Sequence, residues 1–191
     1  MSQTAVFWDS EMMFHKVVEE AAGPVEAVSP LMLAAPFFRG NFAGIIIPTG
    51  FGNVQYSRML PALRACASRI EEYLEAGGKM LVFGAADAGP SRYDWLPVDV
   101  AYHFEFMEHA TETDTSSPWG CLADGYNMEK LPCDGWFEKS DGKAVITSKT
   151  VNAPVLCEWH IGDGTLLLAG VHEYPSTAFL REFAKGEPVH F

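Results

Sequence analysis

Two short apolar runs with a helical pattern between them constrain the fold more than any other feature of this chain. Residues 43–53 read AGIIIPTGFGN and residues 77–89 read GGKMLVFGAADAG, so each run ends in a turn of small residues. Between them, apolar residues recur at helical spacing over residues 57–76, and Gly77-Gly78 supplies a C-terminal cap. A continuous apolar run is typical of a parallel strand buried on both faces. This stretch therefore predicts a β-α-β unit.

The residues before this unit repeat the same alternation. Ala5–Trp8 is apolar, Ser10 can cap a helix that runs to about Ala22, and Val25–Val28 reads as a second strand. The first 90 residues thus alternate strands and helices. This order predicts a three-layer α/β/α sandwich around a mostly parallel central sheet.

The second half of the chain has a different pattern and predicts antiparallel strands. Residues 99–114 alternate roughly in polarity, and Gly162-Asp163-Gly164 is a hairpin turn between two apolar strands. Residues 115–142 are rich in Gly, Pro, Asp and Trp and read as a long loop insertion. Pro175–Lys185 reads as a closing helix. With 191 residues, the chain is expected to form one domain over residues 1–191.

Composition excludes several classes of protein. The 48% of apolar residues supply a full core, and a formal net charge of −12 disfavours partners such as nucleic acid or anionic membrane. No signal peptide is visible, and no apolar run approaches the roughly 20 residues of a membrane span. The four cysteines form no C-x-x-C pair, so neither a zinc site nor a dithiol redox motif is indicated. We expect a cytoplasmic protein without a cofactor.

Ligands of open α/β sheets collect where parallel strands end, and three segments should meet there. The turn after the first apolar run carries Thr49, Gly50, Phe51 and Gly52, whose backbone N–H groups could face an anion. The turn after the second run carries Ala85, Ala86 and Asp87, and the last strand ends at His172 and Glu173.

The order of these segments resembles the class I glutamine amidotransferase-like family. The resemblance covers most of the chain and implies a flavodoxin-like fold. In that family the first turn typically reads P-G-G and contributes oxyanion-hole N–H groups, and Pro48-Thr49-Gly50 stands there in this chain. The elbow after the next strand typically reads G-x-C-x-G and holds the catalytic cysteine. A final H-P-E motif supplies the base and its carboxylate, where this chain has His172-Glu173.

The elbow departs from the family pattern in the residue that matters most. Three registers place Ala85, Ala86 or Asp87 at the nucleophile position, and none supplies a thiol. Glutaminase chemistry requires a thiolate, so we expect a member of the fold that is not an amidotransferase. Cys133, in PCDGW, is the one cysteine whose following turn could present it to a crevice. His172 and Glu173 should point to opposite faces if both lie in a strand.

Several of these residues also have ordinary structural explanations. Asp87 fits an Asx-type cap of the turn after the strand, and His172 fits a hydrogen-bonded structural histidine. His103 and Glu105 share one face of a strand and, with His109, could bind a metal. The alternation of the segment instead favours a half-exposed strand with a polar face, so no metal site is predicted.

Two functions remain open from the sequence, and the first is favoured because no set of nucleophile, base and orienting group can be assigned. The first is binding of a small molecule or a protein partner in the crevice without chemistry. The second is hydrolysis, with Asp87 as nucleophile or with water activated by His172. Asp87 and His172 are expected to border one cleft over Gly50–Gly52 that favours an anionic ligand. Trp119, Tyr126, Trp136 and Phe137 lie in the predicted loop, and their need for cover predicts a homodimer through the loop or the adjoining antiparallel strands.

Overall fold

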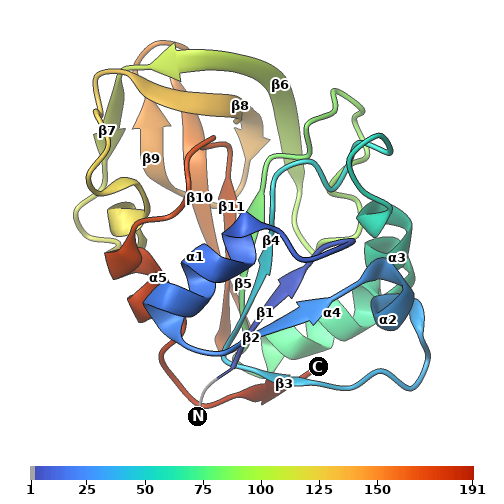
Figure 1. Cartoon of the computed structure of the whole chain (residues 1–191). Helices are drawn as coiled ribbons and strands as arrows, with labels where there is room; N and C mark the ends of the chain where they lie inside the picture. The colour runs from blue at the N-terminus through green and yellow to red at the C-terminus, as the bar shows by residue number, and fades with distance from the viewer. Residues whose placement is uncertain (1–2) are drawn as a thin grey trace.

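The computed structural model describes residues 3–191 and confirms an α/β fold built on one large sheet. The strand order is β2-β1-β4-β5-β11-β10-β9-β7, and the first five of these strands are parallel (Figure 1). Taken in chain order, the parallel strands follow the flavodoxin-like arrangement 2-1-3-4-5. Their bounds are β1 Thr4–Phe7, β2 Val25–Val28, β4 Gly44–Ile47, β5 Lys79–Phe83 and β11 Gly164–Ala169.

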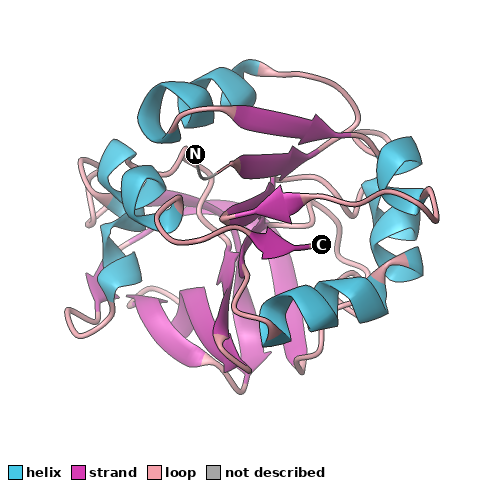
Figure 2. Cartoon of the chain, turned by 90° about the horizontal axis from the view of Figure 1, so that it is seen from below, coloured by secondary structure: helices cyan, strands magenta, loops and turns pink. Residues whose placement is uncertain are grey.

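Side-chain alternation along the parallel strands divides the core into two clusters, one on each face of the sheet. Ile45 and Ile47 face the cluster that α3 Met59–Ala65 and α4 Ala67–Glu75 cover. Ile46 faces the cluster that α1 Met13–Ala22 and α5 Thr177–Phe183 cover. Every residue of β4 is buried, as a strand with helices on both faces requires. Figure 2 shows helices on both sides of the sheet, which confirms the predicted three layers.

The helices lie where the sequence predicts them, but their ends differ. The first helix begins at Met13, and its capping contact is the N–H of Met12 donating to Nδ1 of His15, so Ser10 is not its cap. The predicted helix over residues 57–76 is two helices that meet at Cys66, where the backbone leaves helical geometry. After the second of them, the N–H groups of Gly77 and Gly78 bond to Leu74 and Tyr73, which forms the expected glycine cap.

The antiparallel part corrects the predicted loop insertion. Residues 115–142 contain a 3-10 helix, η1 Pro118–Ala123, and a strand, β8 Leu131–Ser140. The latter pairs with β6 Val100–His109 as a two-stranded ribbon, and its Cys133 also bridges to Val171. The sheet itself continues through β10 Ala153–Ile161, β9 Lys143–Ser148 and β7 Thr111–Thr113. The composition of this segment is typical of loops. It nevertheless forms a strand, because it pairs with residues that are distant in the sequence.

The same segment corrects the reasoning behind the predicted homodimer. Trp119 and Trp136 are each 8% exposed and Phe137 is 1% exposed, so the chain itself covers three of the four aromatic side chains. The large apolar side chains that do reach the surface here lie on β6, where Phe104 is 39% and Phe106 is 59% exposed.

Three short elements complete the fold. The helix α2 Pro30–Ala34 follows β2, and its cap is Ser29, whose hydroxyl accepts the N–H of Met32. The strands β3 Asn41–Phe42 and β12 Val189–His190 pair beside the amino ends of the parallel strands. No helix within residues 3–191 is long and apolar enough to cross a membrane.

Candidate functional site

The turn after β5 has one strained residue at its apex, and this residue distinguishes the three registers that place Ala85, Ala86 or Asp87 there. Ala86 has φ = 51°, and it is one of two non-glycine residues with a positive φ among those described. A strained residue at the tip of a sharp turn after a strand is the geometry that exposes a nucleophile in α/β enzymes. Of the three registers, the one that starts at Gly84 places Ala86 at this strained position. Its methyl group cannot attack a substrate.

Backbone hydrogen bonds join the turn after β4 to the elbow after β5. The N–H of Gly50 donates to the carbonyl of Gly84 at 2.8 Å, and the N–H of Gly52 donates to the carbonyl of Ala85 at 3.1 Å. A Cβ atom on Gly52 would lie 2.8 Å from the Cβ of Ala85, so the two turns are packed backbone to backbone. The N–H groups of Gly50 and Gly52 are thus not available to an anion. The prediction that these two N–H groups face an anion is wrong for that reason.

The side chain of Phe51 is also unavailable to a ligand, because it is fully buried. Its ring centroid lies 5.4 Å from that of Tyr93 and 5.8 Å from that of Trp95. The hydroxyl of Tyr93 in turn accepts the N–H of Ala85 at 3.1 Å. The aromatic packing and this hydrogen bond stabilise the conformation of the elbow. Ala85 and the Phe51 side chain therefore have structural roles.

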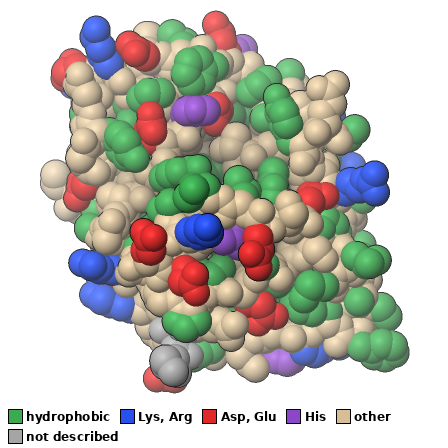
Figure 3. Space-filling model, in the orientation of Figure 1, with side chains coloured by type: hydrophobic (Ala, Val, Ile, Leu, Met, Phe, Trp, Pro, Cys, Tyr) green, Lys and Arg blue, Asp and Glu red, His purple; other side chains and the backbone are tan. Residues whose placement is uncertain are grey.

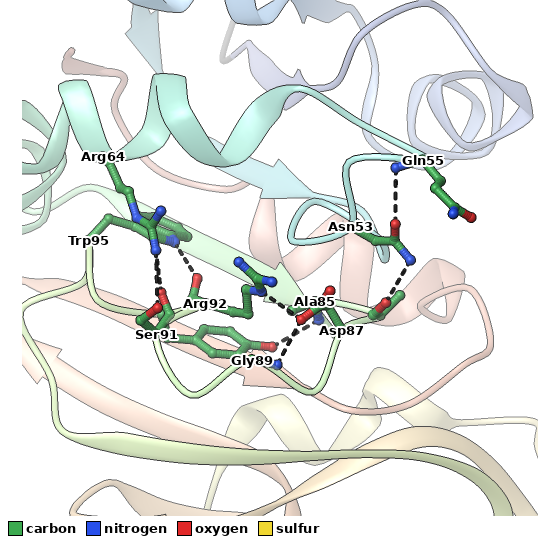
Figure 4. Close-up of polar contacts among 11 residues, drawn as sticks. Asn53, Gln55, Arg64, Ala85, Asp87, Gly89, Ser91, Arg92 and Trp95 are labelled. Carbon is green, nitrogen blue, oxygen red and sulfur yellow. Dashed lines mark hydrogen bonds and ion pairs between the residues drawn. The ribbon is translucent and has the colours of Figure 1, made fainter.

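Asp87 stabilises the turn, as the Asx-type alternative predicted. Its Oδ1 accepts from Nε of Arg92 at 2.7 Å and from the N–H of Gly89 at 2.7 Å (Figure 4). The hydrogen bond from Arg92, followed by that from Gly89, lowers the pKa of Asp87 below its ordinary value. His172 is not among the causes of this lowering.

His172 has a carboxylate partner that the sequence did not reveal. Its Nδ1 lies 2.8 Å from Oδ1 of Asp134, which β8 carries. The Asp134 side chain is 9% exposed and that of His172 is 52% exposed, so a buried carboxylate orients a histidine that reaches solvent. This is the base-and-orienter half of a catalytic triad. Asp134 was missed because its segment reads as a loop, and its place beside Cys133 in PCDGW was the one available signal.

A cavity of about 280 Å³ opens in front of this pair. It lies over the carboxyl ends of β4, β5 and β11, near the point where the strand order reverses and ligands of this fold class bind. Its lining residues are Met12, Phe14, Pro48, Thr49, Phe83, His172, Glu173 and Tyr174.

Three of the predicted site residues line this cavity, namely Thr49, His172 and Glu173. His172 and Glu173 lie beyond the end of β11, so the strand rule that would place them on opposite faces does not apply. Asp87 is not among the residues around this cavity, so it is not a cleft that Asp87 and His172 share. The Arg92 contact holds Asp87 in the elbow turn instead.

Behind His172 lies a second buried polar group. The hydroxyl of Tyr102 and Oδ2 of Asp134 are both buried and have no hydrogen-bond partner within residues 3–191. Burial, followed by the charge of Asp134, raises the pKa of Tyr102. A Cβ atom on Gly84 would lie 2.5 Å from the Tyr102 hydroxyl, so the glycine that starts the elbow also makes room for this tyrosine.

The remaining candidates for chemistry have structural partners. Cys133 is fully buried, and burial raises the pKa of its thiol to about 12, which makes it a poor nucleophile. His103 lies near the carboxylates of Glu105 and Glu138, and buried His109 contacts the hydroxyl of Ser148 at 2.7 Å. Within residues 3–191, no three His, Cys, Asp or Glu side chains form a group that could hold a metal ion.

Comparison with solved structures relates this architecture to several proteins at low sequence identity. A putative GMP synthase protein from Thermoplasma acidophilum superposes with a TM-score of 0.62 at 13% identity, covering 96% of this chain and 92% of that one. A cytoplasmic protein of Salmonella typhimurium LT2, STM1381, gives a TM-score of 0.57 at 12% identity and covers 96% and 95% of the two chains.

A third similar structure is the β-galactosidase from Bacillus circulans sp. alkalophilus, with a TM-score of 0.56 at 11% identity. The match covers 94% of this chain, which spans only 30% of the β-galactosidase. No family model and no curated protein sequence matches the chain. At these identities the likeness concerns the fold alone.

Proposed function

We propose that the protein binds a small molecule in the cavity beside His172 and does not hydrolyse glutamine. The carrying observation is Ala86, which has the strained backbone of a nucleophile elbow but no nucleophilic atom. The N–H groups of Gly50 and Gly52, which an oxyanion would need, are used inside the protein. What remains is a cavity at the ligand-binding edge of the fold.

A glutaminase assay tests the negative half of this proposal. We expect ammonia release from glutamine to stay at the background rate. Release above background that a Cys133→Ser change abolishes would contradict the proposal. Cys121→Ser is the matched control, because Cys121 lies on η1, away from the elbow.

A ligand screen tests the positive half. Small molecules that raise the melting temperature of the protein are retested on His172→Ala, which should lose the effect because His172 lines the cavity. His190→Ala is the control, since exposed His190 lies on β12, beside the amino ends of the parallel strands. If no compound depends on His172, the proposed site is wrong.

The 2.8 Å contact between His172 and Asp134 favours hydrolysis as a second candidate function. A histidine held by a buried carboxylate can take a proton from water as it attacks a substrate. Asp87 is the weaker choice as nucleophile, because Arg92 and Gly89 both engage its Oδ1. Chromogenic esters, amides and glycosides test this function, and any true activity should fall at least tenfold in Asp134→Asn while Asp124→Asn keeps it.

We also propose a homodimer, now through the adjoining antiparallel strands. The exposed Phe104 and Phe106 on β6 support this surface over the buried aromatic side chains of residues 117–139. Sedimentation at tens of micromolar should show a dimer that Phe104→Glu weakens. A monomer at that concentration would contradict the assembly without bearing on the cavity.

A further inference from the structure

The cavity walls favour an apolar or aromatic ligand body. Five of the lining side chains are apolar or aromatic, and the polar side-chain atoms come from Thr49, His172, Glu173 and the hydroxyl of Tyr174. The rings of Phe14 and Tyr174 lie 5.5 Å apart at 50° to each other, and both belong to the lining. A volume of about 280 Å³ is at the small end for ligand sites, so it suits a single-ring molecule better than a nucleotide or a peptide.

The charge inside the cavity is negative. Glu173 is a carboxylate, and no Lys or Arg lies among the lining residues. An anion held here would meet Glu173 without a compensating cation, which costs free energy in a partly enclosed site. The whole chain adds to this preference with its formal net charge of −12, and Figure 3 shows acidic side chains on both sides of the basic side chain near the centre of the view.

His172 strengthens the preference through its tautomer. The Asp134 carboxylate only accepts hydrogen bonds, so the Nδ1 that contacts it at 2.8 Å carries a proton. In the neutral ring, Nε2 is then an acceptor. The cavity therefore presents acceptors at Glu173 and at His172, which match a ligand that donates.

Aromatic rings complete the match to a cation. The faces of Phe and Tyr rings attract an ammonium group that lies within about 6 Å. Phe14, Phe83 and Tyr174 supply aromatic rings in the lining, and the rings of Phe106 and His172 pack edge to face at a centroid distance of 5.1 Å.

We propose that this cavity binds a small organic cation, an ammonium group attached to an apolar ring, with the ammonium at Glu173 and the ring against Phe14, Phe83 and Tyr174. The inference rests on the proposed small-molecule site and names its ligand class. It reverses the sequence-based expectation of an anionic ligand, because the glycine N–H groups behind that expectation are used within the elbow.

Three probes of similar size, each a phenyl ring with a short polar arm, test the inference by calorimetry: 2-phenylethylammonium, neutral 2-phenylethanol and anionic phenylacetate. We expect affinity to fall in that order. Glu173→Gln should weaken the cation roughly tenfold and leave the alcohol unchanged, since it removes the charge and keeps the shape. Glu187→Gln is the matched control, because exposed Glu187 lies just before β12 and should change nothing.

Each of the other outcomes contradicts either the ligand class alone or the ligand class together with the small-molecule site. If the alcohol or phenylacetate binds as tightly as the cation, or if Glu173→Gln leaves cation binding intact, the inference fails and the small-molecule site stands. The inference alone also fails if the ammonium probe does not bind while a neutral or anionic compound binds in a way that depends on His172. If no compound of any charge depends on His172, the inference and the proposed function both fail.

Discussion

The two turns at the carboxyl edge of the sheet, the elbow after β5 and the turn after β11, differ in how completely their polar groups are satisfied. At the elbow, Gly50, Gly52 and Asn53 donate to the carbonyls of Gly84, Ala85 and Ala86, and Arg92 pairs with Asp87. At the turn after β11, His172 is half exposed, Oδ2 of Asp134 has no partner among the described residues, and a cavity opens.

The difference shows where a ligand can still form hydrogen bonds with the protein. A region whose donors and acceptors are all engaged gains stability and offers nothing to a partner, whereas unsatisfied groups beside a cavity cost stability and invite one. In α/β enzymes a turn of this kind exposes the nucleophile, whereas the elbow of this protein has a structural role. The residues around His172 are the functional candidate. Removing a satisfied contact at the elbow should cost stability, whereas removing the unpartnered charge at the turn after β11 should not.

The largest effect is expected from Gly52→Ala in the closed elbow. The new methyl carbon would lie 2.8 Å from the Cβ of Ala85 and 3.0 Å from its carbonyl oxygen, and the backbone there cannot yield easily. We expect a loss of about 2–3 kcal/mol in the free energy of unfolding, measured by urea denaturation. Gly125→Ala is the control, because it adds strain at φ = 90° without any contact within 4 Å and should cost about 1 kcal/mol. Equal losses in the two variants would show that the elbow is not tightly packed.

Asp87→Asn should come next, with a loss of about 1 kcal/mol at neutral pH. The change removes the charged partner of Arg92, although both side chains are partly exposed and solvent screens the pair. The pKa of Asp87 is lowered in the folded state, so its stabilisation is present above its ordinary value of 3.8 and is lost as the pH falls through the folded pKa. The stability difference between wild type and variant should therefore be constant from about pH 5 to pH 7 and vanish in stronger acid. A difference that grows on acidification would exclude the ion pair as its source.

Asp134→Asn should have the opposite sign, because it acts at the open turn. The amide can still accept from Nδ1 of His172, while the buried charge and its unpartnered oxygen disappear. We expect a change between zero and about 1 kcal/mol of added stability. Asp124→Asn is the exposed control and should change stability by less than about 0.5 kcal/mol. A loss as large as that of Asp87→Asn would mean that Asp134 is a structural residue.

The smallest effect is expected at Ala86 itself. Ala86→Gly relieves the strain of a side chain at φ = 51° but adds chain entropy to the unfolded state, for a net gain of about 0.5 kcal/mol. Ala85→Gly is the matched control, since Ala85 is not among the residues with a positive φ and should lose about 1 kcal/mol. Thermal unfolding should show the two variants on opposite sides of wild type, and a loss in both would argue against strain at the elbow.

The sequence predicted the parallel half of the molecule well because that half is built from local signals. Apolar runs such as Ile45–Ile47, the helical spacing that follows and the Gly77-Gly78 cap each specify their element within a few residues. The carboxyl edge of the sheet, and with it the place of His172 and Glu173, follows from that pattern. The missing thiol at the elbow was likewise visible in the sequence alone.

What the sequence could not determine depends on contacts between distant segments. The strand β8 forms because β6 and Val171 pair with it, and only this pairing brings Asp134 to His172. The same holds for the glycine N–H groups. The sequence does not show whether the N–H groups of Gly50 and Gly52 have acceptors. In the structure the turn after β5 lies close to them, and its carbonyl groups accept both hydrogen bonds. Local patterns fix the elements and the edge where they end. Hydrogen bonds across the fold decide which polar groups remain for a ligand, because each donor is satisfied by whichever acceptor the tertiary structure brings near.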